Sequence, residues 1–212
     1  MSKKITFIFD FDGTVADTLP ILINDVYKIN DELKLIEAED VDIEDIRKKS
    51  TEQFLKDLNL GPIKLVRFII KFRKLFNEHL DDVPVTRDLK PVLEKLNQSN
   101  IYLGIVTSNS KSNVKRFLKA NKLSMFSFVD SSFWFFKKDK LLVKAIKKHT
   151  LNSEYTYYIG DETRDVRAAK DAGLKMISVT WGIGMEPILK RFQPDYIIDR
   201  PQELLEILEN LN

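Results

Sequence analysis

The sequence predicts an α/β protein built on a doubly wound, Rossmann-like parallel sheet, with an inserted α-helical segment near its N-terminus. Short runs of β-branched and aromatic residues alternate with helical patterns, and this alternation favours right-handed crossovers between parallel strands. One long interval, residues 18–83, has helical periodicity but no convincing strand run, which indicates an insertion. Acidic and hydroxyl residues follow several of the runs, at the sheet edge where such folds bind ligands.

Six runs are predicted as strands because each is short, apolar and rich in β-branched or aromatic residues. The first, residues 5–9, ends where the turn residues Asp10-Phe11-Asp12-Gly13 begin. The other five are residues 101–107, 126–129, 155–159, 175–180 and 196–198. Helical patterns lie between them, among them residues 89–98, 111–120 and 141–149.

The inserted segment, residues 18–83, is expected to form a helical cap over the sheet. Apolar residues recur at helical spacing within residues 65–76, so this helix must pack one face against others. Residues 1–17 and 84–212 would then make up the core domain that contains the sheet. A cap that closes over a site excludes water and contacts the substrate.

The composition excludes several classes of protein. The chain of 212 residues is 43% hydrophobic and 31% charged, which suits compact units rather than a disordered or fibrous polymer. Its 34 basic and 32 acidic residues are too evenly balanced and interspersed for a nucleic-acid or membrane footprint. We therefore expect a small-molecule partner, no nucleic acid and no membrane, and a monomer or homodimer. The lack of cysteine excludes disulfides and thiolate sites, and with no visible export signal it favours a cytoplasmic location.

Two carboxylates at the end of the first strand suggest a metal site. Asp10 and Asp12 stand two residues apart where the chain leaves its extended form, and Gly13 permits the turn. Crowded carboxylates repel each other and are normally stabilised by a cation. Together with Asp161 they predict a hard, oxygen-binding metal such as Mg²⁺. An ordinary acidic turn is the alternative if the first motif is taken alone.

Several segments resemble the motifs of one family, the haloacid-dehalogenase-type phosphatases. Asp10-Phe11-Asp12-Gly13-Thr14 resembles the first motif, Thr107-Ser108-Asn109 the second, and Gly160-Asp161-Glu162-Thr163-Arg164-Asp165 the fourth. Trp181-Gly182, followed by Pro194-Asp195 and a short strand, is similar to the C-terminal part of phosphoglycolate-phosphatase-like members. The motifs come in the family's order and at the ends of predicted strands.

The resemblance implies a magnesium-dependent phosphatase that acts on a small phosphomonoester such as phosphoglycolate. Asp10 would be the nucleophile and would form an aspartyl-phosphate. Asp12 would be the general acid and base, and its backbone carbonyl would reach the metal. Asp10 and Asp161 would hold the Mg²⁺ through their carboxylates, and Asp165 would support either the metal or a lysine.

The resemblance also implies a phosphate-binding set. The Thr107 hydroxyl, with Ser108 and Asn109, would bind the phosphate oxygens that are not transferred. The third motif supplies a lysine, but the familiar Lys-Pro pair is missing and Lys137, Lys138 and Lys140 compete for the role. A related subgroup places its lysine two residues after an aromatic residue and four before an apolar helix position. That spacing selects Lys138, with Lys140 as the second choice.

Alternatives from other classes remain open. A phosphomutase of the β-phosphoglucomutase kind shares the whole catalytic set, whereas a haloacid dehalogenase needs no metal and usually lacks the aspartate at position 12. A non-catalytic binding protein on the same fold would be expected to have lost one of the catalytic residues. Within the insertion, the basic run Arg47-Lys48-Lys49-Ser50 is a candidate for binding an anionic substrate group, and a solvated charged turn is its alternative.

Overall fold

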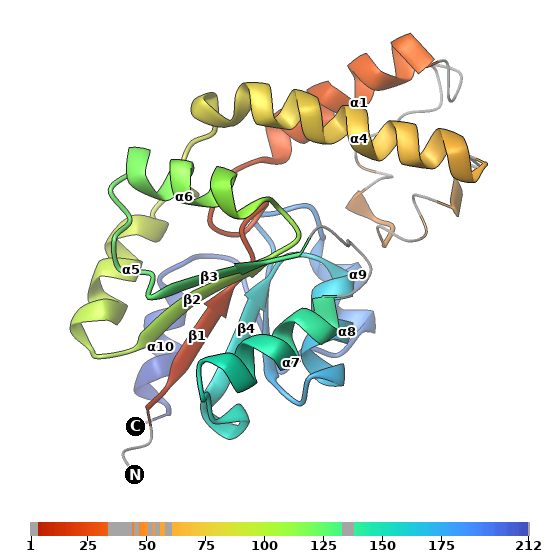
Figure 1. The fold of residues 1–212 in the computed structure, drawn as a ribbon. Coiled ribbons are helices and arrows are strands. Elements are labelled where there is room, and N and C mark those ends of the chain that lie inside the picture. Colours follow the sequence, from red (N-terminus) through yellow and green to blue (C-terminus); the bar gives the residue numbers. More distant parts are fainter. Residues whose placement is uncertain are drawn as a thin grey trace.

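The core of the protein is a six-stranded parallel sheet with helices on both faces (Figure 1). The computed structural model describes residues 4–33, 44, 47–50, 53, 56–57, 61–132 and 138–211. The strands are β1 (Thr6–Phe9), β2 (Tyr102–Thr107), β3 (Phe128–Ser131), β4 (Thr156–Gly160), β5 (Lys175–Val179) and β6 (Tyr196–Ile198). Each overlaps one of the six predicted runs, and all neighbouring strands are parallel. The prediction of a doubly wound parallel α/β sheet is confirmed.

Within the described residues, six helices cover the sheet. They are α5 (Leu89–Gln98), α6 (Lys111–Ala120), α7 (Lys138–Lys148), α8 (Thr163–Asp171), α9 (Glu186–Arg191) and α10 (Glu203–Glu209). Successive side chains of a strand point to opposite faces, so Phe7 and Phe9 of β1 pack with α5, α6 and α10. Ile8 points the other way and packs with α7 and α8. The sheet is therefore buried on both faces, as a parallel sheet requires.

The strand order β3-β2-β1-β4-β5-β6 places a topological switch point beside β1. The chain first extends the sheet from β1 to β2 and β3, and then returns so that β4 pairs with the other side of β1. Phe9 lies opposite Ile159, and the Asp10 N–H donates to the Ile159 carbonyl at 2.8 Å. Ligands of such folds bind beyond the carboxyl ends of strands at this point. The fold thus brings the residues after β1 and β4 together.

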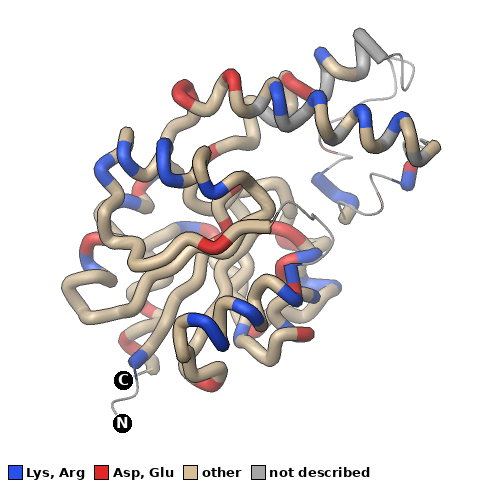
Figure 2. Tube along the Cα trace, viewed as in Figure 1, with Lys and Arg blue, Asp and Glu red and all other residues tan. Residues whose placement is uncertain are grey.

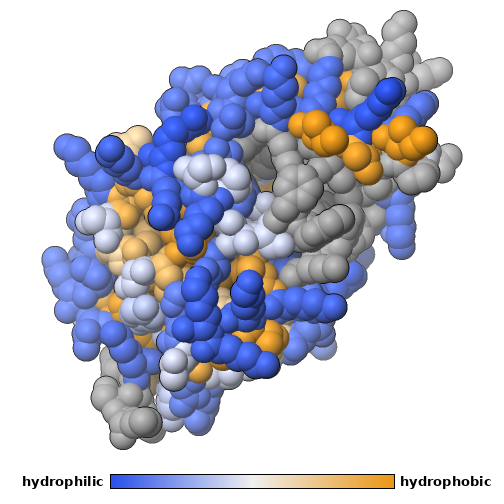
Figure 3. Space-filling view, viewed as in Figure 1, coloured by the Kyte–Doolittle hydropathy of each residue, from blue (hydrophilic) through white to orange (hydrophobic). Residues whose placement is uncertain are grey.

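Two helices of the insertion, α1 (Leu19–Leu33) and α4 (Pro62–His79), lie side by side beyond the carboxyl ends of the strands (Figure 1). Pro62 opens α4, a position where its missing N–H costs no helical hydrogen bond. The short 3-10 helix η2 (Leu80–Asp82) follows α4 and leads back to the core. Apolar side chains gather on the outside of α4 in Figure 3, where Ile63, Val66 and Ile70 are exposed. The division into core and cap domains stays a prediction.

The surface has no single dominant charge in the view of Figure 2, where basic and acidic residues are interspersed along the described chain. Helices α4 and α6 carry several of the basic residues. Among the described helices, none combines the length and the apolar character that crossing a bilayer requires.

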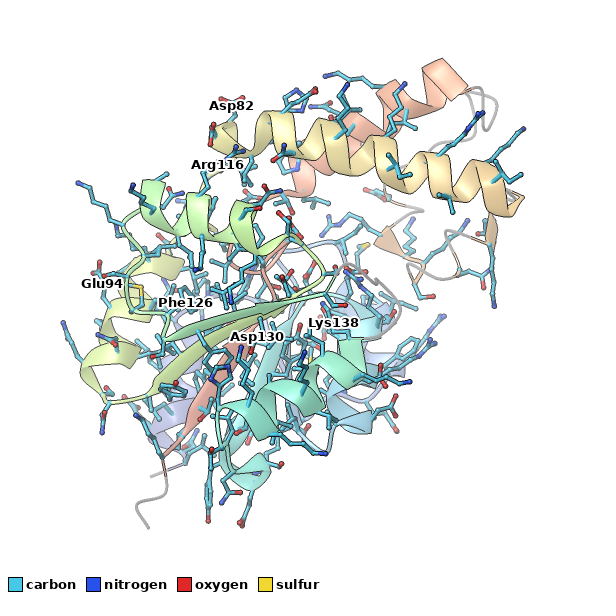
Figure 4. All side chains as sticks on the ribbon, in the orientation of Figure 1. Asp82, Glu94, Arg116, Phe126, Asp130 and Lys138 are labelled. Carbon is cyan, nitrogen blue, oxygen red and sulfur yellow. The ribbon has the colours of Figure 1, made fainter. Side chains whose placement is uncertain are left out.

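Helix α7 is tied to the sheet at its C-terminal end through Asp130 of β3 (Figure 4). The Lys148 ammonium lies 2.5 Å from one oxygen of this carboxylate, and Nε2 of His149 lies 2.7 Å from the other. The His149 ring stacks on Phe128 with 3.9 Å between ring centroids. Burial alone would raise the pKa of Asp130, but these two partners outweigh it and lower the pKa. The register of α7 on the sheet is therefore held by a charged clamp.

Candidate active site

Asp10 lies at the carboxyl end of β1 and is buried, with about 1% of its surface exposed. One carboxylate oxygen, Oδ1, accepts the Phe11 N–H at 2.8 Å. The other, Oδ2, accepts a charge-assisted bond from the Lys138 ammonium at 2.5 Å. The same ammonium lies 2.6 Å from Oδ1 of Asp165. Lys138 therefore bridges two buried carboxylates.

Lys138 is the first residue of α7 (Figure 4), so the helix begins three residues before the predicted start at position 141. Burial alone would lower the pKa of Lys138, but the charges of Asp10 and Asp165 outweigh it and raise the pKa. The ammonium also lies 5.6 Å from the ring centroid of Tyr158, whose hydroxyl donates to the Val106 carbonyl. The lysine is held charged between these groups.

The competing lysines of the third motif are not equivalent in the structure. Lys138 is buried at the carboxylates, whereas Lys140 on the same helix is exposed. Lys137 lies outside the described residues. The structure thus brings the selected lysine to Asp10, and its role in phosphate binding stays a prediction.

Asp161 follows β4 directly and is held by neutral donors on both oxygens. The Thr14 hydroxyl donates to Oδ1 at 3.0 Å, and the Ile183 N–H donates to Oδ2 at 2.8 Å. Burial, followed by the charges of Glu162, Asp165 and Asp10, raises the pKa of Asp161 well above its ordinary value. A carboxylate so placed lacks a neighbouring positive charge among its described contacts.

Asp165 lies in the first turn of α8 and caps that helix. Its Oδ2 accepts the Glu162 N–H at 3.0 Å, and the Glu162 side chain completes the capping box. Burial raises the pKa of Asp165 to about 6, although the charge of Lys138 opposes this shift. The capping interaction at the N-terminus of α8 thus fixes the orientation of the Asp165 carboxylate, which binds Lys138.

Gly13 allows the chain after Asp10 to run directly against Asp161. Its φ is +70°, and a Cβ at this position would lie 2.3 Å from Oδ2 of Asp161. A Cβ on Gly182 would approach the same atom to 2.2 Å. Both contacts are closer than any real Cβ makes, so only glycine fits on either side of Asp161.

The three buried carboxylates of Asp10, Asp161 and Asp165 fit a hard divalent cation. Each offers a ligand oxygen, and these oxygens lie within 4.8 Å of one another. Each carboxylate oxygen has a second lone pair besides the one used in its present hydrogen bond. Asp161 has only neutral donors among its described contacts, and Mg²⁺ would supply a positive charge beside it. Asp12 is the fourth predicted metal ligand, but its side chain is not part of this group of three carboxylates. The predicted contact of Asp12 with the metal is therefore through its backbone carbonyl.

Asp12 instead faces Asn109, in the loop after β2. The Asn109 side-chain amide donates to both Asp12 oxygens, at 3.0 and 3.1 Å. Its own carbonyl is held by the Ser110 N–H and the Asn113 side chain. Burial and the charge of Asp10 raise the pKa of Asp12 to about 7, and the Asn109 hydrogen bond opposes them. Asp12 can therefore give or take a proton near neutral pH.

The second motif lies beside the first, because β2 is the neighbour of β1. Thr107 ends β2 and is buried, and its Oγ1 accepts the Asn109 N–H at 3.1 Å. Ser108 is half-buried next to it. Asn109 was predicted to bind substrate, and in the structure its amide hydrogens are directed at Asp12. The binding of phosphate by Thr107, Ser108 and Asn109 stays a prediction.

Two groups at the site were not singled out from the sequence. Arg164 and Glu162 form a mostly buried ion pair with 2.5 Å between Nη2 and Oε1, and both lie inside the fourth motif. Ile183 contributes only its backbone N–H, so no side-chain pattern could have indicated it.

The basic run of the insertion is divided between different partners. Arg47 donates to two backbone carbonyls of the core, at Gly182 and Ile183. The Lys48 ammonium lies 3.6 Å from Glu44, and the Lys49 ammonium lies 2.8 Å from Asp57. These basic residues therefore do not form one cluster around a common anion site in the structure.

Comparisons with known proteins identify the family of the chain and proteins of similar sequence and fold. The family model described as haloacid dehalogenase-like hydrolase matches residues 7–179. A phosphoglycolate phosphatase of Synechococcus elongatus is 28% identical over 96% of this chain and 97% of its own. A pyrophosphatase, PpaX of Bacillus mycoides, is 27% identical over 99% of both chains. A solved haloacid dehalogenase-like hydrolase of Streptococcus pneumoniae superposes with a TM-score of 0.80 at 23% identity, over 98% of this chain and 100% of that one.

Proposed function

The chain belongs to the haloacid dehalogenase-like hydrolase family, and on that premise we propose that it is a magnesium-dependent phosphatase of small phosphomonoesters. One observation carries the proposal. The buried Asp10 carboxylate is held between the Phe11 N–H and the Lys138 ammonium, beside two further carboxylates and within the same motif as Asp12. This arrangement offers a nucleophile, a cation for phosphate oxygens and an acid in one place.

In the first step, a carboxylate oxygen of Asp10 attacks phosphorus and the bond from phosphorus to the leaving oxygen breaks. Asp12, with its pKa of about 7, gives its proton to that leaving oxygen, so the alcohol departs neutral. Lys138 lies within hydrogen-bond distance of Asp10 and is placed to bind oxygens of the transferred phosphoryl group. The product of this step is a phosphorylated Asp10.

In the second step, the Asp12 carboxylate takes a proton from water as the water oxygen attacks phosphorus. The bond between phosphorus and Asp10 breaks, phosphate is released and both aspartates return to their starting forms. Asn109 keeps the Asp12 carboxylate in one orientation through both steps, because its amide donates to both oxygens. A Mg²⁺ ion held by Asp10, Asp161 and the Asp12 carbonyl would lower the repulsion between nucleophile and phosphate, with Asp165 supporting the site.

We propose that the preferred substrate carries an anionic leaving group. We also propose that the enzyme acts in the cytoplasm. Phosphoglycolate and pyrophosphate, named for two relatives of this chain, release a carboxylate-bearing alcohol and a second phosphate respectively. We place phosphoglycolate first, because the phosphoglycolate phosphatase of Synechococcus elongatus is similar to this chain over 96% of its length. Pyrophosphate hydrolysis is the second candidate, favoured by the similarity to PpaX along the whole chain.

A panel of metabolite phosphates and pyrophosphate tests the proposal, with released phosphate measured in chelator and again after addition of Mg²⁺. Activity should vanish in chelator and return with Mg²⁺. Asp10→Asn should abolish turnover while its unfolding curve stays cooperative, because an amide does not attack phosphorus. Hydrolysis without any divalent metal would contradict the proposal, and conversion of a sugar phosphate to an isomer without free phosphate would identify a phosphomutase.

A further inference from the structure

The loop that covers Asp161 belongs to the core and touches both the carboxylate and its backbone. The Ile183 N–H donates to Oδ2 of Asp161 at 2.8 Å, and the Gly184 N–H donates to the Asp161 carbonyl at 3.1 Å. A Cβ on Gly182 would lie 2.2 Å from that same Oδ2. Backbone and carboxylate are thus in direct contact, so a displacement of residues 182–184 must displace Asp161.

The opposite side of the same loop is held by a residue of the insertion. Nη2 of Arg47 donates to the Gly182 carbonyl at 3.1 Å, and its Nε donates to the Ile183 carbonyl at 3.3 Å. In return, the Met185 N–H donates to the Arg47 carbonyl at 3.4 Å. The planar guanidinium thus donates to two successive carbonyls from two nitrogens in a fixed geometry. A single ammonium group cannot reproduce this geometry.

We propose that Arg47 is a positioning residue that couples docking of the insertion on the core to the orientation of Asp161. The inference rests on the proposed function only in taking Asp161 as a metal ligand. With the insertion docked, Arg47 holds residues 182–183 so that the Ile183 N–H stays on Oδ2 of Asp161. Without this contact the loop and the carboxylate reorient together, and the metal site loosens. The enzyme therefore binds its metal tightly only when the site is covered.

The coupling has a chemical basis in the hydrogen-bond chain itself. The peptide unit between Gly182 and Ile183 accepts from Arg47 at its carbonyl and donates to Asp161 at its N–H. A cationic donor on the carbonyl polarises the peptide and strengthens the bond made by the N–H. The orientation of groups around a metal ligand commonly changes metal affinity ~10-fold to ~100-fold.

The test compares Arg47→Ala with Lys48→Ala, which removes one positive charge from the neighbouring position. The Lys48 ammonium lies 3.6 Å from Glu44, another residue of the insertion, so Lys48→Ala is the control for the loss of one positive charge here. Metal affinity is measured by titration calorimetry with Mn²⁺ on the substrate-free protein, and amide exchange is followed at Ile183. Arg47→Ala should weaken Mn²⁺ binding ~10-fold or more and speed the exchange of Ile183. Arg47→Lys should restore part of both, because an ammonium still donates to these carbonyls.

Three results would overturn the coupling. One is unchanged Mn²⁺ affinity and unchanged Ile183 exchange in Arg47→Ala. Another is an equal loss in Lys48→Ala, which would show a general effect of charge. The third is a raised KM for carboxylated phosphates alone with intact metal affinity, which would make Arg47 a substrate contact. Should Arg47→Ala not fold, Arg47→Gln takes its place with the same expectations. Neither readout needs turnover, so the coupling is tested even if the substrate panel contradicts the proposed function.

Discussion

The Lys138 ammonium lies 2.5 Å from Oδ2 of Asp10, so the cation proposed for phosphate is in contact with the proposed nucleophile before substrate arrives. The contact is a charge-assisted hydrogen bond between two buried side chains. Asp165 holds the other side of the ammonium at 2.6 Å. The ion pairs of Lys138 with Asp10 and Asp165 therefore hold the proposed nucleophile in one orientation.

Replacing Lys138 should cripple turnover, and replacing its neighbour should not. Lys138→Ala is expected to lower kcat ~100-fold or more, since a buried charge beside transferring phosphoryl oxygens commonly contributes several kcal/mol. Lys140→Ala is the matched control, because Lys140 is exposed on the same helix. Steady-state kinetics of the two purified variants decide between them. Near-normal kcat in Lys138→Ala would move the phosphate-binding role elsewhere.

The proton-transfer role of Asp12 predicts a dependence on the leaving group. Asp12→Asn should lose most activity on an alkyl phosphate, whose leaving oxygen needs a proton. It should lose much less in the phosphorylation of Asp10 by p-nitrophenyl phosphate, whose leaving group departs as an anion. Stopped-flow release of p-nitrophenol in a single turnover measures this step alone. An equal loss with both substrates would contradict the role.

Substituting two glycines that have the same φ allows backbone strain to be distinguished from steric collision. Gly13 and Gly173 both have φ of +70°, but a Cβ on Gly173 meets nothing within 4 Å. Gly173→Ala should therefore cost about 1 kcal/mol of unfolding free energy and leave activity unchanged. Gly13→Ala should cost more and also weaken metal binding, because its Cβ collides with Asp161. Urea unfolding and Mn²⁺ titration measure both effects, and equal behaviour of the two variants would refute the collision.

The Asp130 clamp predicts a pH-dependent part of the stability. In the folded protein the pKa of Asp130 lies below its ordinary value of 3.8, because Lys148 and His149 outweigh burial. Its stabilisation is therefore full above that ordinary pKa and is lost as pH falls through the lower folded pKa. Asp130→Asn should lower the unfolding free energy by about 1–2 kcal/mol at pH 7. The loss is limited because the Lys148 side chain is half-exposed, and solvent weakens its ion pair with Asp130.

The difference between wild type and Asp130→Asn should shrink as pH falls below about 4, where the wild-type carboxyl also becomes neutral. Urea unfolding of both proteins at several pH values measures this convergence. Asp171→Asn, at the exposed end of α8, is the control and should show no comparable difference. If the difference in unfolding free energy between wild type and Asp130→Asn stays constant down to acid pH, the ionised Asp130 carboxylate does not stabilise the fold.

The fold was predictable because parallel strands buried on both faces have a local signature. Each strand run was recognised from β-branched and aromatic residues, and its ends were placed within a few residues. The start of α7 was predicted three residues late, because the prediction began at the first apolar residue, Leu141, rather than at Lys138. Its position is fixed by Asp10 and Asp165, which are remote in sequence. Tertiary ion pairs of this kind cannot be read from local patterns.

The carboxylates of the candidate site were predictable for a similar reason, since each follows a strand whose end lies at the switch point. Their chemical roles stay predictions. The direction of Asn109 toward Asp12 was not foreseen, because an amide after a strand is equally suited to phosphate. The contact of Arg47 with core carbonyls was not foreseen either, because backbone acceptors leave no trace in the sequence.

The central place of β1 in the sheet has a consequence for biosynthesis. β1 leaves the ribosome first, yet its partner strands are residues 102–105 and 156–159. A nascent chain therefore carries Asp10 and the apolar side chains of β1 without either neighbouring strand, in a state prone to aggregation. Asp10 and Asp161 meet only after β4 has emerged and paired with β1. A chain that stops before β4 therefore contains Asp10 but cannot assemble the group of three buried carboxylates.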